Sequence, residues 1–175
     1  MDAIKNMLRG TIHLLFGWFD WRSDPFVGVK TIVARPRLAH VEFSVGNVGA
    51  VFIYGGPYPN KPSDIFGVKM AVEIDLPCDV DIPTMDFSTP NVDVMRAGVI
   101  KAIDHLLLHR ELYVGCMGGI GRTGLFMACL IKEMSRRGLV AGGTEDTDDI
   151  VFWIRESYNP YAVETKQQYD YITDF

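Results

Sequence analysis

Cysteine is scarce in this chain, which excludes two classes of protein. The 175 residues include three cysteines, Cys78, Cys116 and Cys129. An odd number without paired spacing predicts neither a disulfide framework nor a zinc site. We therefore expect a cytoplasmic protein of a reducing compartment, with no metal or other cofactor.

Long apolar runs and an excess of positive charge are also missing. No stretch is long enough to span a bilayer, and His13, Gly17 and Asp20 interrupt the apolar N-terminus, with no signal-cleavage site after them. The chain carries 22 acidic and 17 basic residues, a net charge of −5, which argues against general nucleic-acid binding. With 48% apolar residues, residues 1–175 are expected to form a single globular domain.

The N-terminal residues predict an amphipathic helix within an extension over residues 1–24. Apolar side chains recur at helical spacing between residues 2 and 19: Ile4, Met7, Leu8, Ile12, Leu15, Phe16 and Phe19. Three interpretations are open: a helix that docks on the domain, a helix on a membrane surface, or a contact with a partner. Few cations flank the apolar side, which favours docking.

Beyond the extension, strand patterns alternate with helix patterns. Strands are predicted at Thr31–Ala34, Val41–Val45, Ala50–Tyr54, Val68–Leu76 and Glu111–Cys116, and helices over 91–109, 121–137, 147–157 and from 165 onward. Gly46, Asn47 and Gly49 indicate a hairpin, and residues 55–63 a loop. This order predicts an α/β domain with a mainly parallel sheet of four to five strands flanked by helices.

One stretch, VGCMGGIGRTGL at residues 114–125, concentrates the chemistry. It places Cys116 at a strand end, on a glycine-rich loop that begins a helix. Glycines let the loop curl its N–H groups around one point, and the helix N-terminus adds N–H groups and a positive dipole end. Arg122 can add a two-pronged charged hydrogen bond. The pattern predicts a site for a tetrahedral dianion above Cys116, where the positive field favours the nucleophilic thiolate.

This stretch resembles the signature of the cysteine-dependent protein tyrosine and dual-specificity phosphatases. The signature is His-Cys, five residues, Arg and then Ser or Thr; Gly115 stands in place of the histidine. The resemblance implies a phosphatase fold and hydrolysis through a phosphocysteine on Cys116, with the Thr123 hydroxyl bonded to the sulfur. It implies that phosphate is bound by Met117, Gly118, Gly119, Ile120, Gly121 and Arg122.

The resemblance also implies an aspartate that serves as general acid, on the loop before the helix that precedes the catalytic strand. Asp86, 30 residues before Cys116, fits this place best, and Asp81 is the alternative. The Trp-Pro that usually precedes this aspartate is replaced by Thr84 and Met85.

A late segment, residues 162–169, resembles the glutamine segment that positions water in the second step. Glu164 and Gln168 stand where tyrosine phosphatases have two glutamines. The residues themselves also allow another interpretation, because Thr165 and Gln168 have the spacing of a capping box that begins a helix.

Several functions stay open at this point. The resemblance implies a phosphorylated protein or a small phosphoester as substrate; the uncharged loop residues 117–120 disfavour phosphoinositides, and RNA 5′-phosphatases share the Arg-Thr-Gly ending. Gly115 and the missing Trp-Pro favour a module that binds phosphorylated residues without turnover. A rhodanese-like sulfur carrier is a third hypothesis, against which the Arg-Thr-Gly ending argues.

The remaining cysteines and a histidine pair carry simpler expectations. Cys129 is predicted to lie in the core and Cys78 in a loop. His105 and His109, four residues apart on a helix, suit either a metal pair or polar surface side chains, and we expect the latter.

Overall fold

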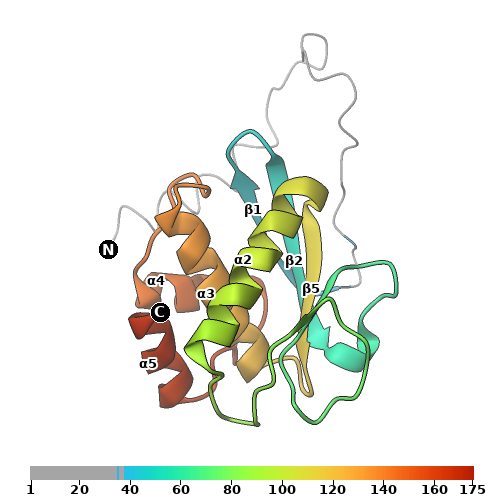
Figure 1. Ribbon diagram of the computed structural model, residues 1–175. Helices are drawn as coiled ribbons and strands as arrows, with labels where there is room; N and C mark the ends of the chain where they lie inside the picture. Colours follow the sequence, from blue (N-terminus) through green and yellow to red (C-terminus); the bar gives the residue numbers. More distant parts are fainter. Residues whose placement is uncertain (1–34, 36–37) are drawn as a thin grey trace. The chain divides into compact units, whose positions relative to one another are not determined.

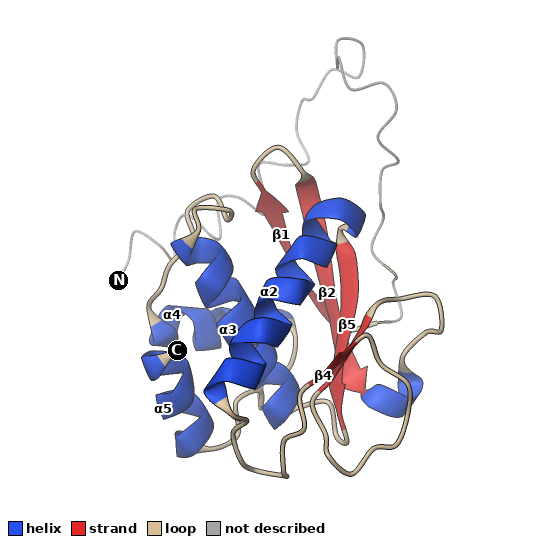
Figure 2. Cartoon of the chain, viewed as in Figure 1, coloured by secondary structure: helices blue, strands red, loops and turns tan. Residues whose placement is uncertain are grey.

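The computed structural model describes residue 35 and residues 38–175, and this part of the chain contains a five-stranded sheet with helices packed on it (Figure 1; Figure 2). The strands are β1 (His40–Val45), β2 (Gly49–Pro57), β3 (Gly67–Lys69), β4 (Val80–Asp81) and β5 (Glu111–Cys116), in the order β1-β2-β5-β3-β4. β1 is antiparallel to β2, and the other pairs are parallel. The predicted α/β class is therefore confirmed. The predicted helix over residues 2–19 and the strand at 31–34 lie outside the described residues.

The β1–β2 hairpin forms as predicted. Val41 and Val45 are buried while Glu42 is exposed, the alternation of a strand with one face on the core. The turn uses positive φ angles at Gly46 (36°) and Gly49 (89°), which glycine adopts without steric cost.

Two predicted boundaries are wrong. Residues 55–57, predicted as a loop, continue β2, because Gly55, Gly56 and Pro57 pair in parallel with the last three residues of β5. The predicted strand Val68–Leu76 ends at Lys69, and the chain then turns, with the Ile74 N–H donating to the Ala71 carbonyl at 3.4 Å. After Lys69 an irregular loop, not a strand, buries Met70, Ala71 and Ile74, whereas Val72 and Leu76 are exposed.

The four helices predicted from residue 91 onward are confirmed, and their caps explain where they begin. They are α2 (Val92–His109), α3 (Gly121–Arg136), α4 (Thr147–Ser157) and α5 (Lys166–Asp174), besides a short 3-10 turn, η1 (Tyr58–Asn60). The Asn91 side chain accepts from two N–H groups at the start of α2, and the Thr165 hydroxyl accepts from the Gln168 N–H of α5. Gly138, with a φ of 67°, follows the end of α3.

Helix α3 is the centre of the helical layer. It contacts α2, α4, α5, β5 and β2, and Figure 1 shows it between α2 on one side and α4 and α5 on the other. Leu125, Phe126 and Leu130 are fully buried, and burial of each such side chain contributes about 2 kcal/mol. Cys129 is fully buried among them, as predicted, and burial raises the pKa of its thiol. Among the described helices, none is long and apolar enough to cross a bilayer.

Candidate functional site

The loop between β5 and α3 curls around the sulfur of Cys116. The Gly119 N–H donates to Sγ at 3.2 Å, and the Thr123 hydroxyl donates to it at 3.3 Å. Gly119 has a φ of +71°, and a Cβ there would lie 2.2 Å from the Gly56 carbonyl carbon, so only glycine fits. Cys116 itself is 3% exposed. The sulfur therefore lies at the base of the loop, with two donors directed at it.

Arg122, in the first turn of α3, joins the loop to two other segments. Its Nη1 and Nη2 donate to the two oxygens of Glu73 at 2.9 and 2.6 Å. Nη1 also donates to the Thr84 carbonyl at 2.8 Å, and Nη2 lies 3.0 Å from Asp86 Oδ1. Arg122 is only 2% exposed. The guanidinium thus holds together the turn after β3, the loop before α2 and the start of α3.

The charge state of Arg122 follows from these partners. Burial by itself lowers its pKa, but the hydrogen bonds that Arg122 donates to Glu73 and the charges of Cys116, Glu73 and Asp86 outweigh burial and raise it. The group therefore stays protonated. Its Nε is buried without an acceptor in the described part of the chain. A buried donor of this kind requires an acceptor, and an anionic oxygen has the charge and geometry to be one.

Of the two acid candidates, Asp86 lies at Arg122 and Asp81 does not. The Asp86 side chain is 62% exposed. Asp81, on β4, pairs with Lys69 at 3.4 Å instead. Asp86 Oδ1 also accepts from the N–H of Phe87, whose φ is 56°. A positive φ at an aromatic residue is a strained conformation, and here it falls directly after the candidate acid.

The late segment packs directly on the start of α3. Val163 has a φ of 61°, and Arg155 holds this conformation by donating to the carbonyls of Ala162 and Val163, both at 2.9 Å. A Cβ at Gly121 would lie 2.1 Å from Oε2 of Glu164. The strained backbone therefore presents the Glu164 carboxylate to the first turn of the helix that carries Arg122.

Gln168 is fully buried and connects this segment by hydrogen bonds to the loop that carries Asp86. Its Oε1 accepts from the Glu164 N–H at 2.9 Å, and its Nε2 donates to the Ser88 carbonyl at 3.4 Å. Thr165 caps α5, which is half of the predicted capping box; the Gln168 side chain accepts from the Glu164 N–H and not from that of Thr165. The Gln168 amide is thus occupied by backbone groups of two neighbouring segments.

Comparison with other proteins adds to this geometry. No protein-family profile matches the chain. Two uncharacterized proteins of Methanocaldococcus jannaschii are each 29% identical to it over 94 residues, 54% of this chain. The chain spans about half the length of these relatives, 56% and 52%.

Among solved structures, Tk-PTP in its active form matches with a TM-score of 0.54 and 21% identity over 71% of this chain and 89% of its own. Kinase associated phosphatase matches with a TM-score of 0.58 and 17% identity, over 79% of this chain and 93% of its own. PTPMT1 in complex with PI(5)P matches with a TM-score of 0.54 and 14% identity, over 70% of this chain and 88% of its own. The chain has the fold of the protein tyrosine and dual-specificity phosphatases.

The packing of this fold explains why position 115 is a glycine. A Cβ at position 115 would lie 2.7 Å from Tyr58 Cα and 2.8 Å from the Gly56 carbonyl oxygen. Backbone atoms cannot yield as a flexible side chain does. The close approach of β2 and η1 to β5 therefore excludes any larger residue where the family signature has histidine.

Two further residues lie at the site without belonging to the signature. Glu73 falls inside the predicted strand Val68–Leu76, and a charged residue within such an apolar run is a signal that it has a partner. Tyr158, which donates a hydrogen bond to the Gly119 carbonyl, carries no motif in the sequence.

The histidine pair and Cys78 lie in other surroundings. The His105 ring stacks on Phe66 and on His109, with ring centroids 4.0 and 4.4 Å apart, and burial lowers the pKa of His105. Burial, with the charge of Asp81, raises the pKa of Cys78. Within the described ranges, no group of three His, Cys, Asp or Glu side chains could hold a metal ion.

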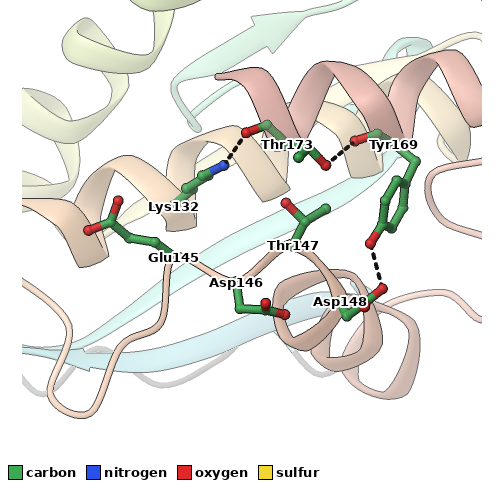
Figure 3. A pocket seen from close by; sticks show the side chains of 7 residues that line it. All are labelled: Lys132, Glu145, Asp146, Thr147, Asp148, Tyr169 and Thr173. Atoms are coloured by element: carbon green, nitrogen blue, oxygen red, sulfur yellow. Dashed lines mark hydrogen bonds between the residues drawn. The ribbon is translucent and has the colours of Figure 1, made fainter.

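A cavity of about 310 Å³ lies between α3, α4 and α5 (Figure 3), and none of its lining residues belongs to the Cys116 loop. The Lys132 amino group donates to the Ile172 and Thr173 carbonyls at 2.7 and 2.9 Å. The Tyr169 hydroxyl donates to Asp148 at 2.5 Å. The polar groups here bond to each other across helices, which ties the helical layer together.

Proposed function

We propose that the chain is a cysteine-dependent phosphomonoester hydrolase that acts on phosphorylated proteins or small phosphoesters in the cytoplasm. The Cys116 thiolate attacks phosphorus, and the bond from phosphorus to the ester oxygen breaks. The leaving oxygen takes a proton from the Asp86 carboxyl group. The product of this first step is a phosphocysteine and the free alcohol or phenol.

In the second step, water attacks the phosphocysteine. The Asp86 carboxylate takes a proton from the water, the bond between sulfur and phosphorus breaks, and the thiolate leaves. The Thr123 hydroxyl, 3.3 Å from the sulfur, stabilises the departing thiolate. Glu164, held beside Gly121, is our candidate for positioning the water, whereas Gln168 holds the surrounding backbone.

The transferred phosphoryl group is bound by Arg122 and the loop N–H groups. Nη1 and Nη2 form one fork on Glu73, which leaves the edge made by Nε and Nη2 for an anion. Asp86 is ion-paired at this edge, so an arriving phosphate displaces its carboxyl group toward the ester oxygen. The observation that carries the proposal is the Cys116 sulfur, which accepts hydrogen bonds from Gly119 and Thr123 and whose charge acts on a buried arginine with an unused donor.

Hydrolysis of p-nitrophenyl phosphate by the wild type and by Cys116→Ser tests the proposal. We expect turnover in the wild type and its complete loss in the variant, with formation of a phosphocysteine detected by mass spectrometry after an acid quench. No turnover in the wild type contradicts the proposal. A panel of phosphopeptides, a phosphoinositide and an RNA 5′-triphosphate then distinguishes the substrate classes.

One observation favours a second candidate, a module that binds phosphorylated residues without hydrolysis. The histidine of the signature is absent, and the space for it is filled by Gly56 and Tyr58. Tight phosphopeptide binding by the wild type without any turnover would support this candidate over the enzyme.

A further inference from the structure

Tyr158 lies at the end of α4, far from the loop in sequence, yet its side chain reaches the Cys116 loop. Its backbone N–H donates to the Ile154 carbonyl at 2.8 Å, which fixes the residue at the helix end. The ring then passes over Gly55 of β2, where a Cβ would lie 2.6 Å from Cε2 and Cζ of Tyr158. The hydroxyl donates to the Gly119 carbonyl oxygen.

With this hydrogen bond, both backbone polar groups of Gly119 have a partner. The Gly119 N–H is directed at the Cys116 sulfur, and its carbonyl is directed at Tyr158. The described residues contain no cis peptide bond, so the Ile120 N–H points opposite to the Gly119 carbonyl. A carbonyl drawn outward to Tyr158 therefore turns the Ile120 N–H inward, to the side on which the loop donors converge.

Resting on the proposed function, we propose that Tyr158 is a positioning residue for phosphate binding: its hydroxyl holds the peptide between Gly119 and Ile120 in the orientation that aims the Ile120 N–H at the phosphoryl group. Tyr158 donates its hydrogen bond to the Gly119 carbonyl and not to the Cys116 sulfur, so it acts through the loop. It thereby supplies a loop anchor in a chain whose position 115 has no room for a side chain.

The surroundings of Tyr158 keep it a donor. Burial raises the pKa of its hydroxyl, and the nearby Tyr113 and Cys116 raise it further. The phenol stays protonated over the working range of the enzyme, so the Gly119 carbonyl always has a donor to accept from.

Tyr158→Phe in the full chain tests the inference, with inorganic phosphate as the probe in a calorimetric titration. We expect phosphate affinity to fall about tenfold, and KM for p-nitrophenyl phosphate to rise with it more than kcat falls. Tyr58→Phe is the matched control. It also removes a buried hydroxyl that donates to a backbone carbonyl, that of Pro77 at 3.0 Å, outside the loop. Equal phosphate affinity in Tyr158→Phe and Tyr58→Phe would overturn the inference.

A second measurement needs no variant. Titration of the ¹⁵N-labelled wild type with inorganic phosphate is expected to move the Ile120 amide proton resonance downfield, as a new hydrogen bond to an anion does. An unmoved Ile120 resonance at saturating phosphate overturns the inference even if the enzyme turns over. Absence of turnover with a normal Ile120 response would instead contradict the proposed function alone.

Discussion

At the residue scale, the site depends on one buried cation, Arg122, whose two terminal nitrogens have partners and whose Nε has none in the described part of the chain. A guanidinium removed from water is costly unless charged and polar groups replace its hydration. Glu73 and the Thr84 carbonyl meet this requirement for Arg122, and they do so from segments that precede it by 49 and 38 positions. Because Glu73 engages both terminal nitrogens, it fixes the plane of the guanidinium before any substrate arrives.

The Glu73–Arg122 pair predicts a dependence of stability on pH. The hydrogen bond from Arg122 lowers the pKa of Glu73 from its ordinary value of 4.5, against the opposing effect of burial. A lowered carboxyl pKa contributes stability that is present above the ordinary value and lost as pH falls through the folded-state value. We therefore expect the free energy of unfolding to fall below about pH 4.5, and to fall less in Glu73→Gln.

Urea unfolding between pH 7 and pH 3 measures this difference. At pH 7, Glu73→Gln should be less stable by about 1–2 kcal/mol, below the cost for a fully buried pair because solvent screens an exposed carboxylate. The Glu73 side chain is 35% exposed. Asp170→Asn, which breaks the exposed pair with Lys166, is the control and should change stability by less than about 0.5 kcal/mol. An identical loss on acidification in wild type and Glu73→Gln would contradict the assignment.

At the scale of elements, the site is formed by loops that buried strands and helices hold in place. Strand β5 and helix α3 are buried along most of their length and position Cys116 and Arg122. The loop between them is held against β2 by close approach of backbone to backbone at Gly119 and Gly56. Loops presented by buried elements in this way are common at functional sites, because the scaffold supplies the rigidity.

Alanine substitution at two neighbouring glycines of this loop should affect stability to very different extents. Gly119→Ala is expected to lower stability by about 2–4 kcal/mol, because it combines a positive φ with a backbone overlap. Gly118→Ala is the control, since a Cβ there would meet no atom closer than 4.0 Å. Thermal unfolding of both variants measures the contrast. A Gly119→Ala midpoint as high as that of Gly118→Ala would show that the loop is not held in this conformation.

At the scale of the whole described domain, α3 joins the sheet to the other helices. Its N-terminal end carries Arg122 and Thr123, and further along the helix Lys132 bonds to carbonyls at the end of α5. A cation at a helix C-terminus is favourable because the helix dipole is negative there. The helical layer is thus stabilised by polar contacts separate from those of the Cys116 loop.

Lys132→Met should separate stability from function. Loss of two hydrogen bonds from a charged donor should cost about 2–3 kcal/mol in urea unfolding, whereas affinity for inorganic phosphate at 25 °C should stay at the wild-type value. Lys166→Met, at a lysine whose side chain is 85% exposed, is the control and should change stability little. Weakened phosphate binding in Lys132→Met would mean that the two ends of α3 are coupled.

Much of the local structure follows from short-range patterns. Asn91 and Thr165 mark helix starts because their side chains bond to N–H groups two or three residues away. The cysteine loop is likewise local, since Cys116, its glycines and Arg122 lie within one strand–loop–helix unit. These features depend on nearby residues alone, so sequence reasoning places them well.

By itself, the sequence determined the alternation of strands and helices and the placement of residues 116–123 in one strand–loop–helix unit, because neighbouring residues specify both. Only the tertiary structure decided that Gly55–Pro57 form a strand, that the run after Lys69 turns to bring Glu73 to Arg122, and that Tyr158 reaches the Gly119 carbonyl. These contacts join residues from 39 to 59 positions apart. They form because buried hydrogen-bonding and charged groups must find partners wherever the fold brings them, and no local pattern records which partner that will be.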